Sequence, residues 1–326
     1  MESEGLGWGL IGPGRFAAEF SEELVKVARC RPVAVASRDL GKAQAFADRF
    51  RFETAYGSYE DLFTDDRVDV VYIVVPHVFH ADLAKKALLA GKAVLCEKPL
   101  TPNPSATRGL VEEAKERGVF LMEAMKTGFL PAIQTAKQWI DEGRIGEPRL
   151  GQADFCFSGP SDPSDRLMNP GLGGGAVLDV GIYPLHLCRL LLGEVVSLSA
   201  QGTLASTGVE DSAAMLARHA SGASSVMTCS FATDEAMSAS IYGTEGTIEI
   251  PLFHAATSVI LKKHDQILEE FSSDEGGMVT AEIEAVTDAV LSGKLECPGH
   301  THNDSIRLSE LMHEVRRQVG SIRRQG

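Results

Sequence analysis

The chain has 326 residues, of which 44% are hydrophobic and 23% are charged, as in a soluble globular protein large enough for two domains. The formal net charge of −14 argues against nucleic acid or an anionic membrane as the main partner. Six scattered cysteines without a CxxC pair, an acidic start without a signal-peptide pattern and the lack of an apolar run of about 20 residues predict a reduced, cytoplasmic protein.

Strands that are apolar on both faces alternate with amphipathic helices through the first 125 residues. This pattern indicates an α/β fold with a doubly wound parallel sheet that is covered on both sides. The predicted strands are 7–12, 32–37, 69–75, 92–96 and 119–123, and the predicted helices are 15–28, 40–50, 81–90 and 104–117.

The pattern changes after about residue 125. A helix is predicted at 131–142, β-rich runs fill 151–271 around one helical segment near 179–192, and helices at 279–291 and 304–319 close the chain. Short strands separated by turn residues predict an α+β domain with a large open, mostly antiparallel sheet. The expected division is therefore 1–125 and 126–326, with the last helix able to pack back on the first domain.

A glycine-rich turn follows the first predicted strand. Gly12-Pro13-Gly14-Arg15-Phe16-Ala17 fits the pattern GxGxxA, with a helix after it. In this context Gly12 permits a tight turn, Gly14 lets the backbone approach a pyrophosphate, and Ala17 permits close packing of helix on strand. We interpret the turn as a dinucleotide site, against the alternative of a plain strand–helix turn.

The second predicted strand ends at Ser37-Arg38, where NAD-specific folds usually carry an acid for the ribose 2′-OH. An arginine at this place suits a 2′-phosphate, and Ser37 adds a hydroxyl donor. The sequence thus predicts NADP as the preferred cofactor, with NAD possible. The alternatives are a solvated Arg38 and a role for Asp39 as the missing acid.

Four motifs occur in a fixed order: the glycine turn, AGKAVLCEKPL at 90–100, VFLMEA at 119–124 and GGGAVLDVGIYPLHL at 173–187. With them the chain resembles the Gfo/Idh/MocA oxidoreductases, and within that family the branch of dimeric dihydrodiol dehydrogenases, also known as NADP-dependent D-xylose dehydrogenases. The resemblance implies a Rossmann domain followed by a substrate-binding and oligomerisation domain. It also implies a homodimer or a higher homo-oligomer.

The resemblance assigns roles to individual residues. It makes Lys98 of the Glu-Lys-Pro motif the active-site lysine near the nicotinamide ribose, with Glu97 orienting its loop. A second segment would lie beside the nicotinamide, and it contains Pro76, His77 in place of the usual asparagine, and His80.

In the fourth motif the resemblance matches Asp179 and Tyr183 to the family's D-x-G-x-H/Y pattern, whose last residue is the acid/base. Three further positions depart from the family. Lys126 stands where relatives have an aromatic residue, Gly128 stands where they have an arginine, and His186 stands where many have an aspartate. Lys126 and His186 are candidate substrate residues, and the changed stretch 125–129 puts the transfer of any relative's substrate in doubt.

The chemistry follows from these residue types. Transfer of a hydride at a carbinol carbon needs a matching proton transfer at its oxygen. We expect Tyr183 to move that proton, because a nearby Lys98 ammonium would lower its pKa from about 10. At this spacing Asp179, Tyr183 and His186 would share one face of a helix. Asp179 can then position the substrate hydroxyl or the Tyr183–Lys98 pair, and His186 is a competing acid/base.

The expected substrate is a sugar, a polyol or a vicinal diol. The alternative from another class is a non-catalytic NADP-binding sensor of the same fold. A third possibility is an enzyme with a different reaction. It would either recycle a tightly held cofactor between two sugars or reduce an imine or a tetrapyrrole. No metal site is expected, because His300-x-His302 fits a loop and a helix N-cap better than a ligand pair.

Overall fold

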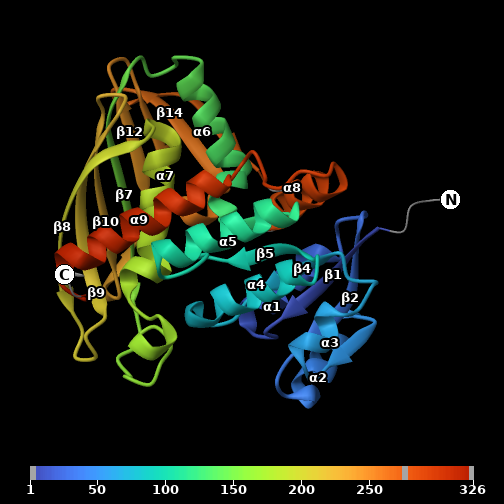
Figure 1. Cartoon of the computed structure of the whole chain (residues 1–326). Coiled ribbons are helices and arrows are strands. Elements are labelled where there is room, and N and C mark those ends of the chain that lie inside the picture. Colours follow the sequence, from blue (N-terminus) through green and yellow to red (C-terminus); the bar gives the residue numbers. More distant parts are fainter. Residues whose placement is uncertain (1–4, 274–277, 323–326) are drawn as a thin grey trace. The chain divides into compact units, whose positions relative to one another are not determined.

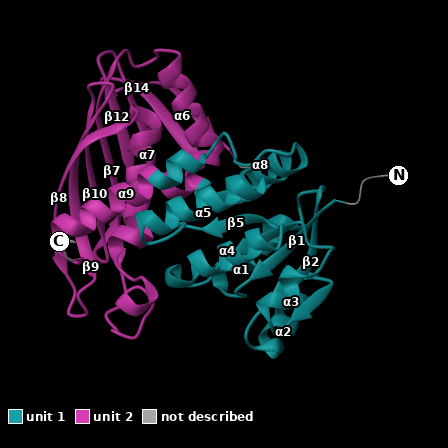
Figure 2. Cartoon of the chain, viewed as in Figure 1, with its two compact units in different colours: residues 1–126, 276–306 teal, residues 127–275, 307–326 magenta. Residues whose placement is uncertain are grey.

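The computed structural model describes residues 5–273 and 278–322 (Figure 1). The chain forms two compact units (Figure 2). Unit 1 comprises residues 1–126 and 276–306, and unit 2 comprises residues 127–275 and 307–326.

Unit 1 contains a six-stranded sheet in which every strand pairs parallel to its neighbours, as predicted. The strand order is β3-β2-β1-β4-β5-β6. Strands β1 to β3 extend toward one edge of the sheet, and β4 to β6 extend from β1 toward the other edge, so the strand order reverses beside β1. Ligands of such folds bind at the carboxyl ends of the strands beside this reversal. The strands are β1 Leu6–Ile11, β2 Cys30–Ala36, β3 Thr54–Tyr56, β4 Val70–Ile73, β5 Ala93–Glu97 and β6 Leu121–Ala124.

Five helices connect these strands: α1 Arg15–Leu24, α2 Leu40–Phe50, α3 Tyr59–Phe63, α4 His80–Leu89 and α5 Pro104–Arg117. The short pair β3 and α3 was not predicted. Helix α1 ends before the predicted residue 28, because the N–H groups of Lys26 and Val27 bond to carbonyls only three residues back.

Unit 1 is completed by a segment from the far end of the sequence. It carries α8 Thr280–Leu291 and the first residues of α9 His302–Val319. The Thr280 hydroxyl donates to Glu23 of α1 at 2.6 Å. The N–H of Leu121 donates to the Leu295 carbonyl at 3.0 Å, beside the edge strand β6.

Unit 2 is built on a nine-stranded sheet. Its order is β15-β14-β13-β12-β7-β10-β9-β8, and β11 pairs with β7. The sheet is mostly antiparallel, as predicted, and β7–β10 is its parallel pair. The strands are β7 Pro148–Ser158, β8 Val195–Leu204, β9 Glu210–His219, β10 Ser224–Ser230, β11 Ala232–Ala236, β12 Ala239–Gly243, β13 Thr247–Ile250, β14 Ser258–Lys263 and β15 Gln266–Ser272.

One face of this sheet is covered by the helices α6 Pro131–Asp141 and α7 Ile182–Leu192 (Figure 1). On the other face the strands leave apolar side chains exposed. In β9, Met215 is buried while Leu216 is 55% exposed, and its partner in the register, Val226 of β10, is 41% exposed. The sheet is thus open on one face in the single chain.

The segment Pro170–Leu192 corrects one prediction from the sequence. It is long and apolar enough to cross a membrane by length and composition, with a mean hydropathy of 1.4. Within the unit, however, 83% of its most apolar window is buried. Its apolar character is therefore that of a core helix.

Candidate active site

The loop after β5 presents Lys98. Glu97 anchors this loop, because its carboxylate accepts from the Tyr72 hydroxyl at 2.7 Å and from the N–H of Lys98 at 3.2 Å. The Lys98–Pro99 peptide bond is cis. Beyond it, the N–H of Leu100 donates to the carboxylate of Glu123 at 2.6 Å. The backbone on both sides of Lys98 is therefore held by carboxylates, those of the half-buried Glu97 and the buried Glu123.

His80 lies at the start of α4 and is fully buried. Its Nδ1 lies 2.8 Å from the Pro99 carbonyl oxygen, and its Nε2 lies 2.8 Å from the Val75 carbonyl oxygen. Burial lowers the pKa of His80, and the two carbonyls oppose that change. The ring thus ties the segment after β4, which includes Pro76 and the buried His77, to the loop that carries Lys98.

The glycine turn has the geometry that a dinucleotide needs. Gly12 has φ +96°, and a Cβ there would lie 2.4 Å from the Val74 carbonyl oxygen, so only glycine fits. A Cβ on Gly14 would meet almost nothing within 4 Å, so the backbone beside it is open to a ligand. Ala17 is fully buried, whereas Arg15 is exposed. These residues fit a bound pyrophosphate at the start of α1.

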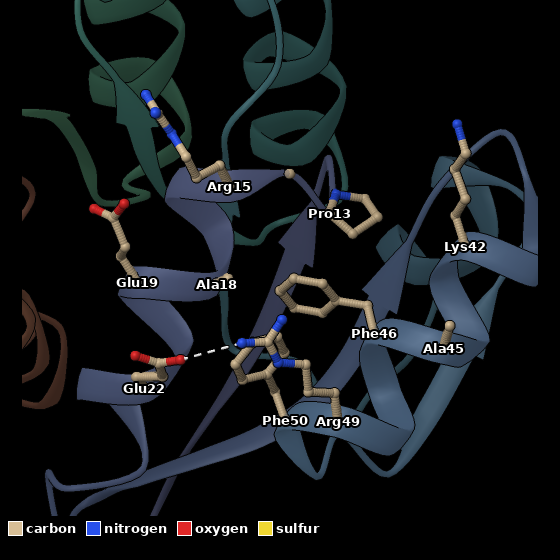
Figure 3. Close-up of a pocket in the computed structure, with 11 residues that line it drawn as sticks. Pro13, Arg15, Ala18, Glu19, Glu22, Lys42, Ala45, Phe46, Arg49 and Phe50 are labelled. Atoms are coloured by element: carbon tan, nitrogen blue, oxygen red, sulfur yellow. Dashed lines mark ion pairs between the residues drawn. The ribbon is translucent and has the colours of Figure 1, made fainter.

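A hollow of about 580 Å³ extends from this turn along α1 and α2 (Figure 3). The rings of Phe46 and Phe50 turn towards it, and Pro13 lies at its edge. Lys42, in the first turn of α2, adds a cation that was not predicted from the sequence. Close by, Arg38 is exposed at the end of β2.

Asp39 has a structural task in the same region. Its side chain caps α2 by accepting from the N–H of Lys42 at 3.2 Å, and its own N–H donates to the Ser37 hydroxyl. The acid that was the alternative ribose ligand is therefore engaged as a helix cap.

Asp179 and Tyr183 lie in unit 2. Asp179 is in the π-helical segment Val177–Gly181, and Tyr183 is in the first turn of α7. The sequence predicted one regular α-helix through both residues. The structure corrects this prediction, because a π-helical segment precedes α7. Pro184 has no N–H to donate back into the preceding turn, which is a physical reason for the wider turn ahead of it.

The π-helical segment receives support from a loop. The guanidinium of Arg166 lies 3.2 Å from the carboxylate of Asp179. Asp179 and Tyr183 are both almost entirely buried, and so is His186, one turn further along α7. The helix that follows is apolar and anchors these three side chains in the core of unit 2.

Two aromatic neighbours of Tyr183 were missed from the sequence. The ring centroid of Phe155 lies 5.2 Å from that of Tyr183, and the centroid of His254 lies 6.1 Å from it. Phe155 and His254 are themselves stacked at 4.1 Å. His254 follows Leu252, which has φ +46°, in a turn that no motif singled out.

Both halves of the chain match models of known families. Residues 6–125 match an oxidoreductase family with an NAD-binding Rossmann fold, and residues 133–249 match the GFO/IDH/MocA C-terminal domain. The chain is 32% identical to the trans-1,2-dihydrobenzene-1,2-diol dehydrogenase of Mus musculus and 34% identical to that of Sus scrofa. Each match covers 97% of both chains.

Solved structures are similar as well. A 3-ketoreductase from Actinomadura kijaniata in complex with NADP has a TM-score of 0.82 and 29% identity, over 96% of this chain and 97% of that one. Levoglucosan dehydrogenase in complex with NADH and levoglucosan has a TM-score of 0.88 and 21% identity, over 97% of each chain, which shows a shared fold. These similarities extend over nearly the whole chain and are not confined to either unit.

Proposed function

The chain belongs to the Gfo/Idh/MocA oxidoreductase family, and we propose that it is an NADP-preferring dehydrogenase or reductase for a sugar, a polyol or a vicinal diol. The loop that presents Lys98 carries this proposal. Its backbone is held by the carboxylates of Glu97 and Glu123 and by the ring of His80 at the Pro99 carbonyl. Tyr72 in turn donates to the carboxylate of Glu97. Such support is the mark of a side chain whose position matters.

In the proposed reaction the nicotinamide supplies the hydride acceptor or donor. As a phenolate, Tyr183 takes the proton of the substrate hydroxyl during oxidation, and as a neutral phenol it gives that proton to the carbonyl oxygen during reduction. The ammonium of Lys98 stabilises negative charge on that oxygen and on the tyrosine. Asp179, with Arg166 at 3.2 Å, holds the turn that presents Tyr183.

The aromatic pair beside Tyr183 supports a hydroxylated substrate. Phe155 and His254 place an apolar ring and an imidazole beside the residue to which we assign proton transfer, a combination that suits a substrate with both C–H and hydroxyl groups. His186 would then serve to pack α7.

A substrate panel tests the activity. Aldoses, inositols, anhydrosugars and aromatic diols are each mixed with NADP and with NAD, and the absorbance of the reduced nicotinamide is followed. We expect turnover with at least one of these classes. Binding of NADP without turnover of any of them would favour the sensor.

Two cations support the preference for NADP, because they suit a 2′-phosphate: Lys42, which lines the hollow beside the glycine turn, and Arg38, which is exposed just after β2. Asp39 is engaged as the cap of α2. We expect Arg38→Ala to weaken binding of NADP about 30-fold and to leave binding of NAD within about twofold. Fluorescence titration with both nucleotides measures this. Equal losses for the two nucleotides would contradict it, and Arg29→Ala in the same unit is the control.

We also propose that the open face of the unit 2 sheet forms a homodimer. Leu216 and Val226 lie opposite each other on β9 and β10 and are largely exposed in the single chain. Leu216→Asp should convert the dimer to a monomer in sedimentation velocity. Leu89→Asp, at a residue 47% exposed on α4 of unit 1, should leave the dimer intact. A dimer that survives the first change would place the contact elsewhere.

A further inference from the structure

Two side chains of opposite charge are buried together in unit 1. Lys126 is 7% exposed and follows β6, and Glu282 is 2% exposed in the first turn of α8. The Nζ atom of Lys126 lies 3.4 Å from the Sδ atom of Met278, two residues before α8 begins at Thr280. The ammonium therefore lies at the start of the helix that carries Glu282.

The same ammonium faces the cofactor turn. Its Nζ atom lies 5.3 Å from the ring centroid of Phe16, inside the GxGxxA turn. Lys126 also follows the strand that pairs with β5, where Ala124 is in register with Glu97. The lysine is thus adjacent to both parts of unit 1 that would hold the dinucleotide, the glycine turn and the Glu97–Lys98 loop.

The charges around Lys126 do not cancel. Burial raises the pKa of Glu282 well above its usual range and also raises the pKa of Glu97, which weakens the negative charge of both groups. Burial lowers the pKa of Lys126, and Glu97 and Glu282 oppose that change. With Lys98 also present, the cluster favours a surplus of positive charge while Lys126 keeps its proton.

We propose that Lys126 biases the bound nicotinamide toward its reduced form. The oxidised ring carries a positive charge and the reduced ring does not, so a buried ammonium nearby repels only the oxidised ring. This bias favours acceptance of a hydride, and hence oxidation of an alcohol. The inference rests on the cofactor part of the proposed function and is independent of the substrate.

Binding alone tests this inference. The dissociation constants of NADP+ and NADPH are measured for the whole chain by titration calorimetry, without substrate. Their ratio cancels every contact that the two forms share, including the 2′-phosphate and the pyrophosphate. We expect Lys126→Met to lower the ratio of the NADP+ constant to the NADPH constant about tenfold. Lys126→Arg, which keeps the charge, should preserve the ratio.

The ratio should also depend on pH. The pKa of Lys126 is lowered, so its ammonium loses its proton at a lower pH than an ordinary lysine does. As the pH rises, the ratio should therefore fall toward the value of Lys126→Met. The charged groups that act on Lys126 are Glu97, Glu282, Lys98 and Glu19. Ionisation of Glu97 and Glu282 changes the ratio in the wild type and in Lys126→Arg alike. The ratio of Lys126→Arg should therefore fall less than that of the wild type over the same range, because its guanidinium does not titrate there.

An unchanged ratio in Lys126→Met would overturn the inference. If that variant does not fold, parallel pH curves for the wild type and Lys126→Arg would overturn it instead. If only NAD+ and NADH bind, the same ratio is measured with them, and if neither pair binds, this inference and the proposed function both fail. If the ratio of the two dissociation constants changes as expected but no alcohol is turned over, the inference is supported and only the proposed activity is contradicted.

Discussion

Replacement of Tyr183 by phenylalanine is expected to slow hydride transfer about 1,000-fold, with binding of the nucleotide unchanged. The change removes only the hydroxyl that we assign to proton transfer. The ring, which packs beside Phe155 and His254, is retained, so the fold of unit 2 should persist. Single-turnover formation of the reduced nicotinamide, after rapid mixing of enzyme, NADP and a substrate from the panel, measures the effect.

His186→Ala is the companion experiment, because His186 lies one turn further along α7 and has a more suitable unperturbed pKa for the same task. We expect this variant to keep most of the single-turnover rate, with a loss of stability from the cavity that it leaves. If the histidine variant is inactive and Tyr183→Phe is active, the acid/base assignment is wrong.

Replacement of Arg316 by methionine is expected to lower the free energy of unfolding by about 3 kcal/mol, because it leaves a buried carboxylate with the Ser321 hydroxyl as a donor but without its cationic partner. Glu210 is fully buried, and its Oε1 atom accepts from Nε of Arg316 at 2.8 Å. Its Oε2 atom has no hydrogen-bond partner among the described residues. Urea denaturation followed by circular dichroism measures the change.

Arg317→Met is the matched control. Arg317 is the next residue of α9 and pairs with Glu314 at the half-exposed surface, where an ion pair contributes little. The double variant Arg316→Met with Glu210→Gln should recover part of the lost stability, because no charge remains buried. Equal effects of Arg316→Met and Arg317→Met would show that the Glu210 pair has no special weight.

The fold was predictable where local patterns are strong. Fully apolar strands such as 93–96 and amphipathic helices such as α5 announce a covered parallel sheet, and the predicted and observed bounds of α2 and α5 coincide. The elements β3 and α3 escaped because three strand residues and a five-residue helix are too short for a periodic signal. The parallel pair β7–β10 depends on partners about 70 residues apart, which no local pattern encodes.

The candidate site shows the same division. Motifs singled out Lys98, Asp179 and Tyr183 as candidates, because each motif is a short continuous run of the sequence. The supports of Lys98 were not found, since Tyr72 and Glu123 read as ordinary residues of buried strands. A polar residue inside an apolar strand was the available signal. His254 gave none, because only tertiary packing brings its turn beside Tyr183.

The interrupted sequence of unit 1 has a consequence for how the protein is made. Three hydrogen bonds join the two sequence segments of unit 1: Thr280 to Glu23, Thr287 to Cys30 and Leu121 to Leu295. A ribosome therefore releases the nucleotide-binding sheet long before it releases the segment 278–306 that completes it. During synthesis the N–H of Leu121 in the edge strand β6 therefore lacks its partner, the Leu295 carbonyl, until residues 127–275 of unit 2 have been translated.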